Sequence, residues 1–127
     1  MTTAKQKLIF SILMSLCIIQ PVAAATSNIE GVIKGAECHL YGKLCSDDKM
    51  DIKPRFEKDF VLVTDDHYYL LDNLPYAEKL RLNGASVQVQ GDTYSHTISV
   101  NQVRTKTSHG YKTVWDGDEI DNELYEN

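Results

Sequence analysis

The sequence from residue 26 onward predicts one small domain that is all-β apart from one short helix. Three observations support this class. Short runs of β-branched and aromatic residues alternate in polarity, turn-forming residues separate these runs, and only one stretch repeats its apolar residues at helical spacing. The whole chain has 127 residues, which suits a single modest core and leaves no room for a second domain.

The first 25 residues have the three-part layout of a secretory signal. Lys5 and Lys7 give a positive start, an apolar run follows at residues 8–19, and Pro21 precedes a run of small residues that ends at Ala25. The apolar run is too short for a membrane-spanning helix, which needs about 20 residues. We therefore expect cleavage after Ala25 and a periplasmic or secreted protein.

The first strand is predicted at residues 29–36, where Gly31 and Gly35 indicate a bend. A polar loop is expected to follow from Cys38 to about Lys58. The β-branched run at residues 60–64 and the run at residues 68–71 flank a turn and predict a hairpin.

One short helix is predicted next, at residues 76–82. Asn73 can cap its start, Pro75 suits its first turn, and Asn83 with Gly84 can end it. A second hairpin is expected after the helix. Its strands lie at residues 86–90 and 97–101, with a turn that begins at residues 91–92.

This order of elements matches the OB-fold, a five-stranded Greek-key barrel with its helix between the third and fourth strands. A small open sheet or a sandwich with the helix on one face is the alternative. We prefer the OB-fold-like barrel because the single predicted helix falls at the expected place in the order. The domain then spans residues 26–115, followed by a tail at residues 116–127.

Residues 60–103 resemble the bacterial OB-fold family of small periplasmic proteins. The matching phrases are Tyr68-Tyr69-Leu70-Leu71-Asp72, Val87-Gln88-Val89-Gln90-Gly91 and Ile98-Ser99-Val100-Asn101-Gln102-Val103. The resemblance implies an exported protein that is linked to envelope stress, with no catalytic residues to transfer. The loop between Cys38 and Cys45 departs from the family pattern, so the resemblance does not extend to a shared ligand.

The two cysteines beyond the signal, Cys38 and Cys45, predict one structural disulfide, because an exported protein meets an oxidising environment. A metal site is the alternative. In the reduced state, Cys38, His39 and Cys45 could hold zinc or copper(I), which would make the chain a periplasmic metal-binding protein. We favour the disulfide, since no second spaced pair of ligands completes a metal set.

Ligands of OB-folds usually meet the barrel face and the loops that join strands one to two and four to five. In this chain those loops are residues 38–58 and 91–96. The candidate contacts are His39, Tyr41, Tyr94 and His96, with Tyr68 or Tyr69 on the barrel wall. The alternative is that many of these tyrosines pack their rings into the core and expose only the hydroxyl group. The partner is expected to be a small ligand, an envelope component or a protein.

No motif indicates catalysis. Asp65, Asp66 and His67 occupy the predicted hairpin turn, where aspartate is favoured for local backbone hydrogen bonds. Ser95-His96 and Ser108-His109 lack the context of a nucleophile elbow, and the chain has no glycine-rich phosphate loop. We expect a non-enzymatic protein with no metal and no cofactor.

The acidity of the chain belongs mostly to its end. Residues 116–127 contain six acidic residues and no basic one, which predicts a solvated, disordered tail. Residues 26–115 are nearly neutral, with 12 acidic and 11 basic residues. This composition gives no basic stripe, so nucleic acid is an unlikely partner.

Overall fold

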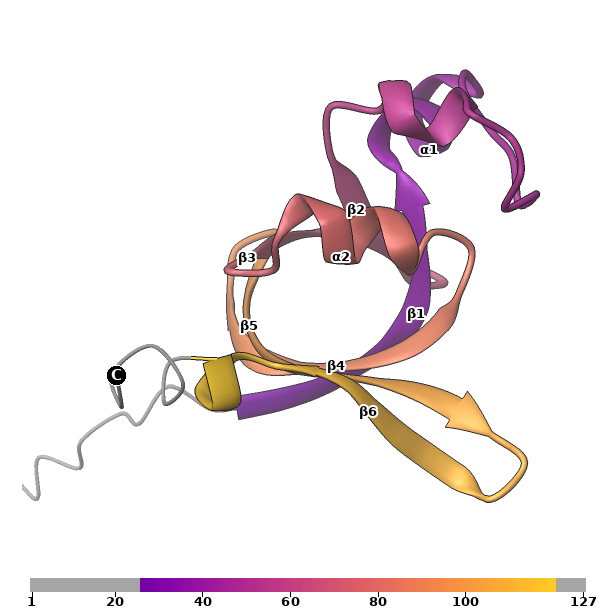
Figure 1. The fold of residues 1–127 in the computed structure, drawn as a ribbon. Coiled ribbons are helices and arrows are strands. Elements are labelled where there is room, and N and C mark those ends of the chain that lie inside the picture. The colour runs from indigo at the N-terminus through magenta and orange to yellow at the C-terminus, as the bar shows by residue number, and fades with distance from the viewer. Residues whose placement is uncertain (1–25, 121–127) are drawn as a thin grey trace, which may run out of the picture.

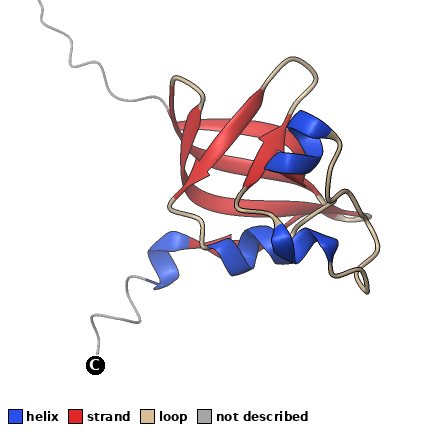
Figure 2. Ribbon diagram, turned by 90° about the horizontal axis from the view of Figure 1, so that it is seen from above, coloured by secondary structure: helices blue, strands red, loops and turns tan. Residues whose placement is uncertain are grey.

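The computed structural model describes residues 26–120, which form a six-stranded sheet with short helices at its periphery (Figures 1 and 2). The elements, in chain order, are β1 (Thr26–Gly35), α1 (Ala36–Tyr41), the 3₁₀-helix η1 (Lys53–Phe56), β2 (Phe60–Val63), β3 (Tyr68–Asp72), α2 (Tyr76–Arg81), β4 (Ser86–Tyr94), β5 (Thr97–Thr107) and β6 (Gly110–Asp116). The predicted signal at residues 1–25 and the end of the predicted tail at residues 121–127 lie outside the described residues.

The mainly β class is confirmed, but in place of the expected five strands and one helix, residues 26–120 contain six strands, the three short helices named above and a helical turn at residues 117–120. Neighbouring strands follow the order β3-β2-β1-β4-β5-β6, and β3 also pairs with β5 in parallel. The other pairings are antiparallel. Figure 1 shows the curved strands beneath α2, with the β5–β6 hairpin pointing away from α1.

Strand β1 joins the two halves of the sheet. It pairs with β4 from Thr26 to Val32 and with β2 from Val32 to Gly35, so Val32 has a partner on both sides. A Cβ atom at Gly31 would lie 2.5 Å from the backbone oxygen of Val63. Glycine is therefore required there by the close approach of β2.

The first predicted hairpin is confirmed as β2 and β3. The predicted turn of the second hairpin at residues 91–92 is wrong, because β4 continues to Tyr94 and the turn is at Ser95 and His96. The register of β4 against β5 shifts at Gly91, where a Cβ atom would lie 2.1 Å from the backbone oxygen of Ser99. Gly91 thus permits a bulge within a strand and does not form a turn.

The predicted helix is confirmed as α2, but Asn73 does not cap it. Pro75 is the N-cap residue, and Asn73 adopts a left-handed conformation with φ of 64°. The side-chain amide of Asn73 donates a hydrogen bond to the backbone oxygen of Val100 at 3.1 Å. Lys79 of α2 is buried and its Nζ lies 2.8 Å from a carboxylate oxygen of Asp59, which ties the helix to the start of β2.

The first strand ends at Gly35, so Ala36, predicted as its last residue, begins α1. The long loop expected at residues 38–58 includes the rest of α1 and all of η1, and Glu57 joins the two helices. The Glu57 side chain is buried, and its two carboxylate oxygens accept hydrogen bonds from the backbone N–H groups of Glu37 and Cys38, each at 2.9 Å. The Tyr76 hydroxyl donates to the backbone oxygen of Glu57 at 2.6 Å. Glu57 therefore holds the start of α1 and the start of α2 against the same point of the chain.

The sixth strand, β6, is the element that the sequence analysis misses. Gly110, with φ of 111°, follows the two-residue turn that reverses the chain after β5. Trp115 then joins the core near the end of β6. The predicted tail therefore starts as ordered chain, since Asp116 belongs to β6 and residues 117–120 are helical.

The core lies between the sheet and α2 and draws on every strand. Its buried members are Ile33, Phe60, Leu62, Leu71, Leu74, Leu82, Val87, Val89, Ile98, Val100, Val103 and Trp115. The apolar positions alternate along β4 and in the first part of β5, as expected for strands with one buried face. Within residues 26–120, no helix has the length and apolar character needed to cross a membrane.

Replacing Glu57 by alanine is expected to lower the free energy of unfolding by about 1–3 kcal/mol, because two partly buried N–H groups lose their acceptor. Urea denaturation measures this change. Glu57→Gln should lose less, since one oxygen is retained. Lys58→Ala, at the exposed neighbouring position, is the matched control. If Glu57→Ala and Lys58→Ala unfolded at the same urea concentration, the proposed role of the carboxylate would be contradicted.

Candidate ligand-binding face

Three of the predicted contact residues, His39, Tyr68 and His96, come together in one row. The His39 and Tyr68 rings meet edge to face with their centroids 5.4 Å apart. Tyr68 and His96 have nearly parallel rings, at an interplanar angle of 20° and a centroid separation of 6.5 Å. We call these three residues the His-Tyr-His row. It joins α1, β3 and the β4–β5 turn, which are far apart in the sequence.

Each member of the row has a separate structural support. His39 lies in α1. Glu57 accepts hydrogen bonds at the start of this helix, and the Cys38–Cys45 disulfide joins the helix to the segment that follows it. Tyr68 begins β3 and is paired with Val63 of β2. The predicted disulfide is thus present, and it fixes the helix that carries the first ring of the row.

His96 is positioned by the turn between β4 and β5. Ser95 takes a positive φ of 53°, which lets the chain reverse in two residues. The backbone oxygen of His96 then accepts a hydrogen bond from the Leu70 N–H at 2.7 Å, which joins the turn to β3. The parallel pairing of β3 with β5 continues from this contact, so the position of the His96 ring depends on long-range pairing.

Tyr94 and Tyr41 lie outside the row. The Tyr94 hydroxyl donates to a carboxylate oxygen of Asp72 at 3.1 Å, which joins the end of β4 to the end of β3. This hydrogen bond raises the pKa of Tyr94 above its ordinary value of 10.0, with smaller contributions from burial and from the negative charge of Asp72. Tyr41 ends α1 with 67% of its surface exposed. Tyr69, the alternative wall residue, packs against the core.

The row offers flat rings and nitrogen atoms that donate or accept hydrogen bonds. Leu70 adds an exposed apolar side chain on the strand that carries Tyr68. A surface of this kind can pack against the apolar face of a sugar or of a ring.

The other sequence candidates are separated from this face or engaged elsewhere. Within residues 26–120, no group of three histidine, cysteine or acidic side chains is arranged to hold a metal ion. The sulfur atoms of Cys38 and Cys45 are bonded to each other. His67 is in the β2–β3 turn. Its backbone N–H donates a hydrogen bond to the Thr64 hydroxyl, and its backbone oxygen accepts one from the backbone N–H of Thr64.

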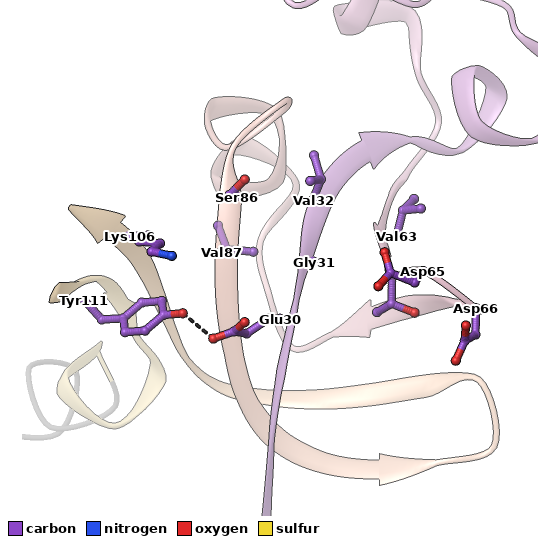
Figure 3. Close-up of a pocket in the computed structure, with 11 residues that line it drawn as sticks. Glu30, Gly31, Val32, Val63, Asp65, Asp66, Ser86, Val87, Lys106 and Tyr111 are labelled. Carbon is purple, nitrogen blue, oxygen red and sulfur yellow. Dashed lines mark hydrogen bonds between the residues drawn. The ribbon is translucent and has the colours of Figure 1, made fainter. Parts of the chain in front are cut away.

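A groove that the sequence analysis did not predict lies where β1 passes from β4 to β2 (Figure 3). It has a volume of about 490 Å³. Val32 and Val63 lie along it, Asp65 and Asp66 line one side, and Lys106 lies on the other. The outward-facing positions of β1 are visible in the alternation of the sequence, but its pairing with two strands is not, so the pattern alone gives no sign of the groove.

No family model, curated protein or solved structure matches this chain. The functional proposals therefore depend on the geometry of the described residues and on the sequence patterns given above.

Replacing Asp72 by asparagine is expected to lower the pKa of Tyr94 toward 10.0, because the carboxylate acceptor is lost. Spectrophotometric titration of the tyrosines, with Tyr94→Phe to assign the signal, measures the change. The raised pKa means that this hydrogen bond stabilises the folded state below pH 10 and that the contribution is lost as the pH rises through the folded-state pKa. A Tyr94 titration unchanged in Asp72→Asn would contradict the assigned cause.

Replacing Cys38 and Cys45 together by serine should lower the free energy of unfolding by about 2.5 kcal/mol, the chain-entropy value for so short a loop. The ring of His39 should also lose its fixed contact with Tyr68. Urea denaturation measures the first effect, and histidine ring resonances in NMR spectra measure the second. If the His39 ring signals kept their chemical shifts in the double variant, the disulfide would not be what positions the ring.

Proposed function

We propose that this chain is an exported, non-enzymatic binding module of the OB-fold type. Several pairings support the fold. Strand β1 pairs with β2, β2 with β3, β3 with β5, β5 with β4, and β4 with β1. Helix α2 lies between β3 and β4 in the chain. This order of pairings supports the proposed five-stranded Greek-key barrel, to which β6 would be an addition at the end. The predicted signal and the Cys38–Cys45 disulfide support export.

The observation that carries the binding role is the His-Tyr-His row. It combines the first strand connection, through α1, with the β4–β5 turn and the wall strand β3. These are the regions through which OB-folds usually bind their ligands. The ligand that suits the row presents a flat apolar face with polar edges, such as a sugar of an envelope component. A role in envelope stress follows only from the resemblance to the periplasmic OB-fold family.

A direct test is to titrate the ¹⁵N-labelled protein with disaccharide fragments of the cell-wall glycan and follow amide shifts. The expected shifts fall on α1, β3 and the β4–β5 turn. Tyr68→Ala and His96→Ala should each weaken binding about 2- to 10-fold, the size of one ring contact. His109→Ala, a histidine in the β5–β6 turn, is the matched control and should bind normally.

Shifts that fall elsewhere on the domain would reject the row as the glycan site. Equal affinities of Tyr68→Ala, His96→Ala and the His109→Ala control would do the same. Urea denaturation of each variant separates a loss of binding from a loss of folding.

A further inference from the structure

The groove beside β1 has two valines and a serine along its floor, with two aspartates on one side and a lysine on the other. Val32 pairs with Ser86 of β4 on one side and with Val63 of β2 on the other, so these three residues lie in one row across the sheet. All three line the groove. The floor is therefore set by strand pairing and is rigid.

The charged groups of the two sides have no partners across the groove. Asp65 and Asp66 are exposed in the β2–β3 turn, and Lys106 is exposed near the end of β5. None of the three takes part in an ion pair within residues 26–120. Figure 3 shows the two aspartates on one side of β1 and Lys106 on the other.

Glu30, the remaining acidic group of the groove, is already engaged. Its carboxylate accepts a hydrogen bond from the hydroxyl of Tyr111, which reaches it from β6. This contact raises the pKa of Tyr111, with further contributions from burial and from the charge of Glu30. The Arg104 guanidinium lies over the Tyr111 ring, 5.8 Å from its centroid. The Tyr111 hydroxyl is neutral, so this hydrogen bond orients the Glu30 carboxylate and leaves its negative charge in place. The negative groups of the groove are therefore Asp65, Asp66 and Glu30, and its positive group is Lys106.

We propose that this groove binds a short peptide with free ends, whose ammonium group faces Asp65 and Asp66 and whose carboxylate faces Lys106. Such a ligand matches both charged sides at once, and its body covers the valine floor. This site is separate from the His-Tyr-His row, so the proposal goes beyond the function proposed above.

The spacing of the strands sets the length of the peptide. Thr105 pairs with Val87, which places Lys106 level with Ser86. From there to the end of β2 are three strand spacings of about 4.8 Å, or about 14 Å in all. The Lys106 side chain shortens this distance. An extended tripeptide reaches about 10 Å, whereas a single amino acid covers about a third of that length.

The test uses trialanine as the probe, with NMR titration of the labelled protein. Shifts are expected at the amides of Val32, Val63 and Ser86. N-acetylated trialanine and trialanine amide, which each lack one terminal charge, should bind about 2- to 5-fold more weakly, the size expected for a partly exposed ion pair. Free alanine should bind more weakly than trialanine because it cannot reach both sides.

Variants assign each end of the peptide to one side of the groove. In the double variant Asp65→Asn, Asp66→Asn, N-acetylation of trialanine should no longer weaken binding. In Lys106→Met, amidation of its carboxyl end should no longer weaken binding. Asp47→Asn and Lys112→Met change exposed charges outside the groove and should bind like the original protein.

Several outcomes would overturn the proposal. They are an absence of shifts at the three amides up to the solubility limit of trialanine, equal binding of the blocked and free peptides, and equal binding of alanine and trialanine. Circular dichroism and urea denaturation of each variant exclude unfolding as the cause of a lost signal.

Discussion

The buried carboxylate of Glu57 is the contact on which the placement of α1 and α2 depends. It accepts hydrogen bonds from two backbone N–H groups at the start of α1, while the backbone oxygen of the same residue accepts one from Tyr76 at the start of α2. A Cβ atom at Gly35 would clash with the Glu57 side chain, so glycine at the end of β1 is part of this arrangement. A single residue of a long connection thus fixes two helices relative to the sheet.

The two proposed sites use the same short hairpin in different ways. Tyr68 begins β3 and contributes to the His-Tyr-His row, whereas Asp65 and Asp66 in the preceding turn line the groove beside β1. Phe60, Val61 and Leu62 of β2 are all buried, so this short strand anchors the hairpin in the core.

The sequence predicts the local features well because each depends on neighbouring residues. The β2–β3 hairpin, helix α2 and the disulfide all follow from short patterns. Asn73 and Gly91 are residue types common in caps and turns, but here a contact with β5 decides the role of each. Asn73 donates to the backbone oxygen of Val100, and Gly91 lies against the backbone oxygen of Ser99. Of the six predicted contacts, His39, Tyr68 and His96 do meet, but only pairing across the sheet could reveal which of them would do so.

The Cys38–Cys45 bond also makes a closed covalent ring of the segment that carries His39. This ring contains exposed residues such as Tyr41 and Lys43, which a protease could reach. A single cut within the ring leaves β1 joined to the rest of the chain through the sulfur atoms. The exposed connection can therefore survive one proteolytic cleavage without releasing the central strand of the sheet.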